Sequence, residues 1–153
     1  MAWGLALAAL VAAGFAEPAV ARSSRTASKL IHIMLSSTGD EVMFDQNRVD
    51  AKYGRHLLLT YRNDAPLDSK IAHNVAIIRP GRADALLVVL QEHGYDLASV
   101  KGSPDLVAMT RTLQPSEQDT IDFAPPTRGD YEYVCLMPGH GDMMGMRGIL
   151  RVK

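Results

Sequence analysis

Apolar and polar side chains alternate in a series of short segments along most of this chain, and this alternation limits the fold to a few β architectures. A period of two is typical of strands that bury one face, and Gly, Pro, Asn and Asp separate the segments here. Strands are expected at residues 29–35, 41–45, 55–62, 73–78, 119–123, 131–135 and 148–152, and residues 47–54 resemble a strand and turn. Short strands of this kind predict an antiparallel β-sandwich or barrel.

One stretch departs from the two-residue period. Over residues 82–93 the apolar side chains recur at helical spacing, and Gly94 is placed to end a helix. Ser103-Pro104-Asp105 then resembles the N-cap and first turn of a second helix that reaches residue 111. The sequence therefore predicts a helical insertion between strands over residues 82–113.

The N-terminus resembles an export signal. Residues 3–15 form an uncharged apolar run, and Ala19-Val20-Ala21 matches an A-x-A cleavage pattern. Cleavage after Ala16 and an uncleaved anchor are alternatives, although the run is shorter than the roughly 20 residues that span a bilayer. We expect the following organisation: a signal peptide at 1–21 with cleavage near Ala21, a polar linker at 22–29, and one exported, for example periplasmic, domain at 30–153.

The charge composition argues against two classes of partner. The chain has 16 basic and 17 acidic residues and a formal net charge of −1, with the signs mixed along the sequence. Nucleic-acid binding usually needs a basic face, and anionic membranes attract basic clusters. We therefore expect neither partner, and the near-neutral charge predicts weak electrostatic steering toward any partner.

Cys135 is the single cysteine of the chain. Exported proteins commonly use cysteine in disulfides, and one cysteine cannot form a disulfide within the chain. The thiol is therefore a buried core group, a nucleophile or a metal ligand. A core thiol would leave the Pro-Gly-His sequence after it without a role. A nucleophile would lie on a strand that runs directly into Pro-Gly, and no protease signature surrounds it.

The residues after the cysteine favour a metal, and copper in particular. The segment CLMPGHGDMMGMRG, residues 135–148, combines a thiol, an imidazole and four of the eight methionines. Thiolate and thioether suit Cu(I), and imidazole suits both oxidation states. A trigonal His₂Cys set with a weak axial methionine forms a blue electron-transfer site. This segment supplies Cys135, His140 and a methionine, so the second histidine must lie elsewhere.

His73 is the best candidate for that second histidine. It opens a predicted strand after an irregular stretch, a position from which a side chain can reach the end of a sandwich. The remaining histidines lie in or beside predicted strands or in the predicted helix, without neighbouring ligands, and are expected to be ordinary surface or core residues: His32, His56 and His93.

Together these motifs resemble the cupredoxins, the small blue copper proteins, and within them the azurin and auracyanin branch. The motifs are the Cys-x-x-Pro-Gly-His of residues 135–140, the Met-x-Gly of residues 146–148 and the His-Asn-Val of residues 73–75. The resemblance covers residues 30–153 and includes the helical insertion. It implies an all-β Greek-key sandwich or barrel of about eight strands that holds one type 1 copper ion.

By position, the resemblance implies that His73, Cys135 and His140 are the equatorial copper ligands. It also implies that Asn74 links the two ligand segments beside the thiolate. Leu136 follows the cysteine where many relatives carry Thr or Ser. One side-chain link to Asn74 is therefore expected to be missing.

The axial methionine is ambiguous. Azurin spacing, four residues after the histidine, selects Met144, whereas the five-residue spacing of auracyanin and plastocyanin falls on Gly145. Alignment on the final strand selects Met146. We prefer Met146 because a strand holds a ligand more firmly than a loop of variable length does. Met143 is the remaining alternative.

The resemblance implies an electron carrier and not an enzyme. Copper would cycle between Cu(II) and Cu(I) without a small-molecule substrate, and the protein is expected to be a monomer. His140 is expected at an exposed edge with an apolar rim of Met137, Pro138, Met143 and Met144, where redox proteins dock weakly. The alternative is a copper storage or delivery protein of the same fold, because thioethers of the methionine-rich loop bind Cu(I).

Overall fold

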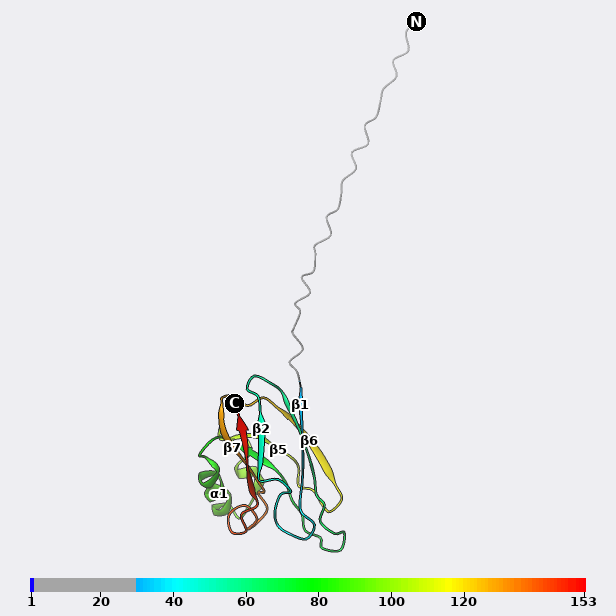
Figure 1. The fold of residues 1–153 in the computed structure, drawn as a ribbon. Coiled ribbons are helices and arrows are strands. Elements are labelled where there is room, and N and C mark those ends of the chain that lie inside the picture. Colours follow the sequence, from blue (N-terminus) through cyan, green and yellow to red (C-terminus); the bar gives the residue numbers. More distant parts are fainter. Residues whose placement is uncertain (2–29) are drawn as a thin grey trace.

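The computed structural model describes Met1 and residues 30–153. The predicted signal peptide beyond Met1, the cleavage site near Ala21 and the linker at 22–29 therefore lie outside the described residues. Within them, eight strands form two sheets, with one α-helix and one short 3₁₀ helix between the fourth and fifth strands (Figure 1). None of the described helices is long and apolar enough to cross a membrane.

The two sheets face each other as a sandwich. The first has the order β1-β3-β6 and consists of β1 (Ile31–Ser36), β3 (Leu57–Arg62) and β6 (Gln118–Phe123). The second has the order β2-β8-β7-β4-β5 and consists of β2 (Arg48–Ala51), β8 (Arg147–Val152), β7 (Gly129–Val134), β4 (Ala76–Ile78) and β5 (Leu106–Met109).

The sequence predicted antiparallel pairing, but both sheets contain parallel as well as antiparallel pairs. β1 pairs with β3 and β2 pairs with β8 in parallel, whereas the other pairs are antiparallel. A parallel pair needs a long connection between its strands. Here β1 and β3 are joined through β2 of the opposite sheet, and β2 and β8 are separated by most of the domain. Alternation within a strand carries no information about this long-range pairing.

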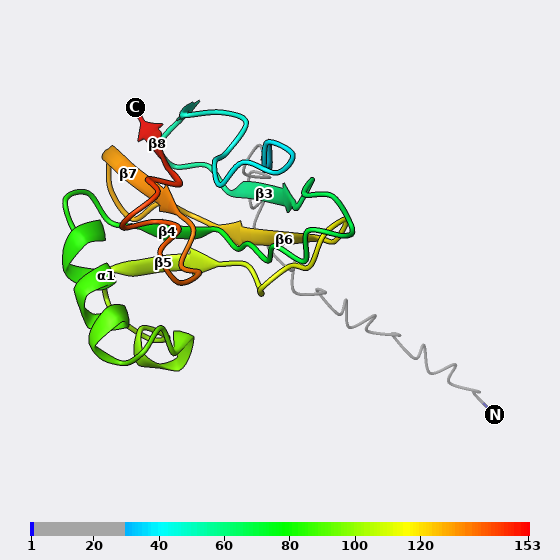
Figure 2. The ribbon, with the colours of Figure 1, turned by 90° about the horizontal axis from the view of Figure 1, so that it is seen from below.

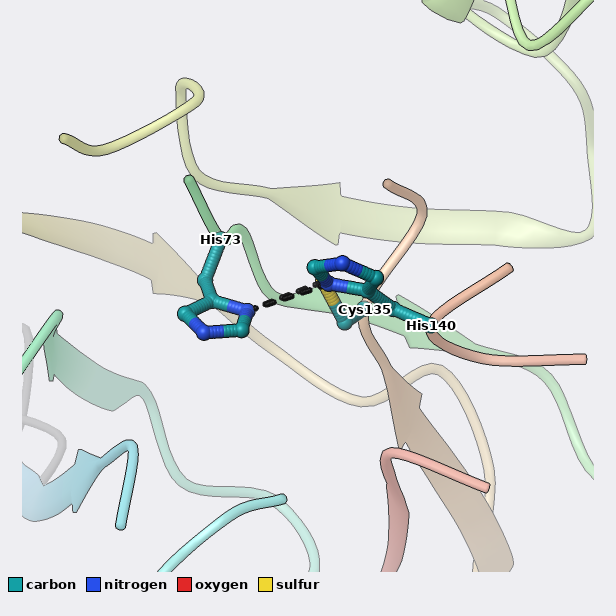
Figure 3. Close-up of side chains that lie close together, drawn as sticks. All are labelled: His73, Cys135 and His140. Carbon is teal, nitrogen blue, oxygen red and sulfur yellow. Dashed lines mark hydrogen bonds between the residues drawn. The ribbon is translucent and has the colours of Figure 1, made fainter. Parts of the chain in front are cut away.

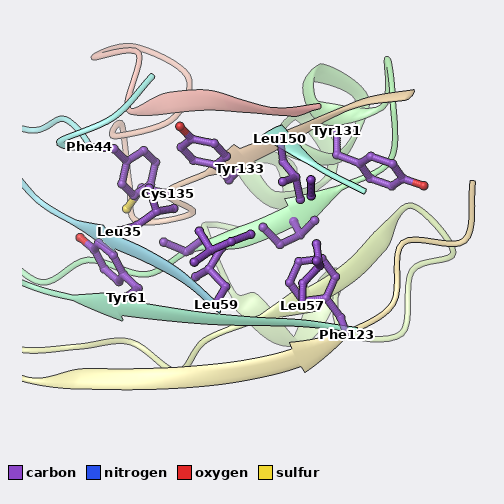
Figure 4. Packing of buried hydrophobic residues seen from close by; sticks show 14 of the residues in the cluster. Leu35, Phe44, Leu57, Leu59, Tyr61, Phe123, Tyr131, Tyr133, Cys135 and Leu150 are labelled. Atoms are coloured by element: carbon purple, nitrogen blue, oxygen red, sulfur yellow. The ribbon is translucent and has the colours of Figure 1, made fainter. Parts of the chain in front are cut away.

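The main core lies between the sheets and follows the predicted alternation. In β3, Leu57, Leu59 and Tyr61 point inward and are buried, while the residues between them are half-buried. Figure 4 shows them facing Tyr133 and Leu150 of the second sheet. Removing one large apolar side chain from water stabilises the fold by about 1.5–3 kcal/mol, so the alternation decides which face of each strand turns inward.

A helix covers the outer face of the second sheet (Figure 2). Helix α1 (Ala83–Glu92) confirms the helix predicted from residue 82, and the 3₁₀ helix η1 (Leu97–Ser99) follows it. The helix buries residues spaced three and four apart, as an amphipathic helix does: Ala83, Leu86, Leu87 and Leu90. They pack in a second core with Ile78, Val134 and Leu136.

The second half of the predicted helical insertion is wrong. No helix follows Ser103, and residues 106–109 instead form β5 beside β4. The backbone groups along β4 need hydrogen-bond partners, and this pairing overrides a weak local helix signal. Residues 41–45 also fail to form the predicted strand, because only an isolated bridge joins Ser37 and Phe44.

Four connections meet at one end of the sandwich, the lower end in Figure 1: residues 37–47, 63–75, 110–117 and 135–146. The strand registers bring them together, since Arg62 pairs with Gln118 and Ala76 pairs with both Met109 and Val134. We call this the cysteine end, because Cys135 begins the last of these connections. The turn 52–56 and the C-terminal Lys153 lie at the opposite end (Figure 1).

Candidate metal centre

Strand pairing brings together three donor side chains that are far apart in sequence. Cys135 directly follows β7, and His140 lies in the loop after it. His73 precedes β4 and forms an isolated bridge with Leu113. Because β4 and β7 are neighbours, His73 reaches Cys135 across 62 residues of sequence.

The three donor atoms form a small triangle (Figure 3). The distances are 3.8 Å from His73 Nδ1 to Cys135 Sγ, 3.5 Å from that sulfur to His140 Nδ1, and 3.2 Å between the two Nδ1 atoms. A point equidistant from all three lies about 2.0 Å from each, which is close to metal–imidazole and metal–thiolate bond lengths. Within the described part of the chain, no other trio of His, Cys, Asp or Glu converges in this way.

Burial prepares both imidazoles to bind a metal. Desolvation and, to a smaller extent, the neighbouring His140 lower the pKa of His73 to about 4. Desolvation also lowers the pKa of His140, although Asp142 opposes this shift. Both rings are therefore neutral at pH 7. Burial raises the pKa of the Cys135 thiol to about 11, so a metal that binds the thiolate must displace its proton.

The structure separates the candidate axial methionines by burial. Met146 is fully buried in the core cluster that contains Cys135, whereas Met144 and Met143 are 57 % and 78 % exposed. The backbone of Met146 bonds to both ligands: its N–H donates to His140 O at 2.8 Å, and its carbonyl accepts from Cys135 N at 3.1 Å. This placement supports Met146 as the fourth ligand. A His₂Cys trigonal set with a weak thioether is the donor set of blue copper.

Asn74 joins the two ligand segments. Its Oδ1 accepts a 2.7 Å hydrogen bond from the backbone N–H of Leu136, the residue after Cys135. Its buried Nδ2 has no hydrogen-bond partner among residues 30–153. The leucine side chain offers no acceptor, so this unpaired amide fits the missing link expected from Leu136.

The sequence analysis missed Asn63, which holds the segment of His73. Asn63 is fully buried, and its Nδ2 donates to Ile71 O at 2.8 Å and Leu113 O at 3.0 Å. Its Oδ1 accepts from Ser37 Oγ and from the N–H of Ala65. Leu113 O also accepts from the N–H of His73. A turn sequence alone gives no sign that this amide is buried.

The insertion braces the loop of His140. The hydroxyl of Tyr95, just after α1, donates to Asp142 Oδ2 at 2.6 Å. Arg147 donates to Asp84 of α1 at 2.7 Å and to the carbonyl of Gly141. Gly141 itself must be glycine, because a Cβ there would lie 2.5 Å from the Cys135 carbonyl oxygen.

The other three histidines lie outside this cluster. His56 Nδ1 lies 3.0 Å from Asp122 on the exposed face of the first sheet. His93 Nδ1 lies 2.8 Å from Val89 O at the end of α1, and His32 is exposed on β1. None of them shares a donor triangle with another potential ligand within residues 30–153.

Comparison with known proteins identifies relatives over almost the whole described domain. The family model of copper binding proteins, plastocyanin/azurin family, matches residues 31–153. Auracyanin-A of Chloroflexus aurantiacus is 23 % identical over 117 residues, which cover 74 % of this chain and 70 % of that protein.

Solved structures of two auracyanins share the fold. Reduced auracyanin of Roseiflexus castenholzii superposes with a TM-score of 0.68 at 24 % identity, over 80 % of this chain and 96 % of that one. Auracyanin A of C. aurantiacus, described as a blue copper protein, gives a TM-score of 0.69 at 23 % identity, over 81 % of this chain and 99 % of that one.

Proposed function

The chain belongs to the plastocyanin/azurin family of copper-binding proteins, and from this we propose that it is a type 1 copper protein that carries single electrons between redox partners in an exported compartment. The convergence of His73 Nδ1, Cys135 Sγ and His140 Nδ1 carries the proposal. We assign these three residues as equatorial ligands and Met146 as the axial ligand, with Met144 as the alternative.

Copper bound here supplies a one-electron change between Cu(II) and Cu(I). The protein holds the donors: Cys135 lies at the end of a strand, His73 is bridged to Leu113, and Met146 is bonded to the backbone on both sides. Donors held in place offer one geometry to both oxidation states. Cys135 is fully buried and burial raises its pKa, which argues against a nucleophile. Its sulfur lies 3.8 Å and 3.5 Å from the Nδ1 atoms of His73 and His140, which supports a ligand.

Partners are proposed to dock at the cysteine end, around His140. The ring of His140 is half-buried, and the same loop exposes Pro138, Met143 and Met144. Exposed thioethers and a proline form an adaptable apolar rim. We expect a monomer whose contacts with its partners stay below about 1,200 Å² in total, as in other weak redox encounters.

One observation favours a second candidate function, copper storage or delivery. Met143 and Met144 are exposed in the same loop as His140, and their thioethers are suited to bind Cu(I) before it reaches the buried donors. A delivery protein would give up Cu(I) readily, whereas a carrier retains copper through many electron transfers.

The test is to add Cu(II) to the purified protein and record its visible spectrum. We expect an intense thiolate charge-transfer colour that disappears on reduction, returns on reoxidation and is absent in Cys135→Ser. A colourless protein that binds only Cu(I) would overturn the carrier in favour of delivery. The double variant Met143→Leu/Met144→Leu serves as the matched control, because a carrier keeps its colour without these thioethers.

Export has a separate test. The intact mass of the protein recovered from its own cells should correspond to a chain that starts near Arg22. A mass that corresponds to the uncleaved chain would contradict the predicted signal peptide.

A further inference from the structure

A cavity of about 550 Å³ opens at the end of the sandwich opposite to the cysteine end (Figure 1). It lies between the edge strands of the two sheets, because Ile31 of β1 and Ala51 of β2 both line it. Four charged residues complete the lining: Asp50, Lys52, Arg55 and Lys153. Ligand cavities commonly measure about 300–1,000 Å³, so this cavity has room for a small organic molecule.

The apolar part of the lining belongs to the main core. Ala51 is buried in the core cluster between the sheets, and Ile31 is half-buried against that cluster. The side chain of Ala51 is a single methyl group, which leaves space that a larger residue at this position would occupy. An apolar group that enters the cavity therefore leaves water and contacts the edge of the core, which favours its binding.

The charged part of the lining consists of three cations and one carboxylate. Lys153 Nζ pairs with Asp50 at 2.7 Å, and Arg48 lies 3.3 Å from the same carboxylate. These contacts with Lys153 and Arg48 hold the pKa of Asp50 below its ordinary value. Lys52 and Arg55 form no ion pair among residues 30–153. The carboxylate is therefore already neutralised, and two cations remain for a ligand.

Backbone hydrogen bonds fix the walls of the cavity. The N–H of Tyr53 donates to Lys153 O at 2.8 Å, and the N–H of Lys153 donates to Ala51 O at 3.0 Å. On the other wall, the N–H of Ile31 donates to His56 O at 3.0 Å. The cavity thus exists before a ligand arrives, and a preformed site loses less affinity to the ordering of its own residues.

The size and charge of the lining narrow the class of ligand. A nucleic acid or an anionic membrane needs a wide basic face. Here the excess is limited to two cations beside one cavity with an apolar floor. Such a lining matches one molecule that carries a negative head group on a short apolar chain.

We propose that this cavity binds a small amphiphilic anion. The head group, a carboxylate or a phosphate, contacts Lys52 and Arg55, and the chain lies on Ile31 and Ala51. An arginine at the rim suits both head groups, because its guanidinium can donate two parallel hydrogen bonds to either. The inference does not depend on the proposed electron-carrier function, since the cavity and the metal donors lie at opposite ends of the sandwich.

The test is to titrate octanoate into the ¹⁵N-labelled protein and to follow its amide NMR spectrum. We expect saturable shifts at Ile31, Ala51, Lys52 and Arg55 with a Kd of about 1 mM, and none in residues 135–146. Acetate has the charge without the chain, and 1-hexanol has the chain without the charge. Each should bind at least about tenfold more weakly. Absence of saturable shifts with octanoate, or equal binding of acetate, would overturn the proposal.

Matched variants test the charged part of the lining. Lys52→Gln/Arg55→Gln should weaken octanoate binding about tenfold, because it removes the charge-assisted hydrogen bonds to the head group. Lys70→Gln/Lys101→Gln removes two other exposed, unpaired cations and should leave the binding unchanged. Equal weakening in both variants would show that only net charge acts, which would overturn the site.

A second pair of variants tests the apolar part. Ala51→Leu fills the cavity without changing its charge and should abolish octanoate binding, and the smaller Ala51→Val should weaken it. Denaturant unfolding of each variant shows whether it folds. Unchanged affinity for octanoate in a folded Ala51 variant would overturn the proposal. Octanoate should also leave the colour of the copper-loaded protein unchanged. A protein that binds octanoate but gives no blue colour would overturn the electron carrier and support this site.

Discussion

The segment of His73 and the loop of His140 reach the same site with very different support. His73 is fully buried, exchanges two backbone hydrogen bonds with Leu113 and is backed by the buried side chain of Asn63. His140 is half-buried, and its loop contains Gly139 and Gly145 at positive φ. That loop is braced from the surface through Tyr95 and Arg147.

The difference in support matches two requirements of a metal site that exchanges electrons: a fixed ligand geometry and access for a partner. Displacing a ligand embedded in the core requires the full free energy of unfolding. A loop with surface contacts can open locally at a lower free energy. The exposed ligand lies where a partner can approach, and the buried one keeps the geometry. Changes on the His73 side should therefore alter folding, and changes on the His140 side should alter the properties of the metal.

The largest effect is expected from Asn63→Ala. The substitution removes four hydrogen bonds and leaves Ile71 O and Leu113 O with a lost donor, which should lower the free energy of unfolding by about 4 kcal/mol. Denaturant unfolding of the copper-free protein measures this loss in the free energy of unfolding. Asn47→Ala, at an exposed asparagine, is the control. A loss as small as that of the control would contradict the comparison, because the segment of His73 would then not depend on the buried amide of Asn63.

The second effect is the pH dependence of the copper-free fold. The pKa of His73 is about 4 when folded and about 6.5 when unfolded, so the unfolded chain binds the proton first as pH falls. Stability should therefore be unaffected by this group above pH 6.5 and should fall by about 3 kcal/mol between pH 6.5 and pH 4.

Unfolding curves at several pH values test this expectation. His73→Gln should remove most of the loss, whereas His56→Gln, at an exposed histidine, should retain it. Equal stability at pH 6.5 and pH 4 in the unsubstituted chain would mean that His73 accepts a proton in the folded state.

The third prediction compares the two methionines that compete for the axial position. Gln at position 146 would replace a soft thioether with an amide oxygen, which favours Cu(II). Met146→Gln should therefore lower the reduction potential by about 59 mV, a tenfold change or about 1.4 kcal/mol, and change the visible spectrum. Met144→Gln, at the exposed position, is the matched control. If only the control variant shifts the potential, Met144 is the axial ligand.

The smallest effect is expected from Tyr95→Phe, which removes only the hydroxyl that bonds Asp142. The loop of His140 should open more often, so amide hydrogen exchange at Met143, Met144 and Met146 should accelerate about threefold in the copper-free protein. Tyr53→Phe makes the same chemical change at the opposite end. Unchanged exchange in the loop would show that the brace through the insertion has no effect on it.

Local patterns predicted much of this molecule. Alternation located β1, β3, β6, β7 and β8, because burial of one strand face depends on neighbouring residues. The Cys-x-x-Pro-Gly-His and His-Asn-Val motifs pointed to His73, Cys135 and His140, which the structure brings together. Local patterns did not predict β5, the parallel pairs or the network of Asn63, because these depend on which distant backbone lies alongside.

The sequence by itself determined the donors of the candidate site, since a thiol, two imidazoles and thioethers are chemical facts of the chain. Only the tertiary structure decided which methionine is buried beside Cys135 and which ones face water. Burial depends on distances in space, and the fold sets those distances by joining connections that are far apart in sequence.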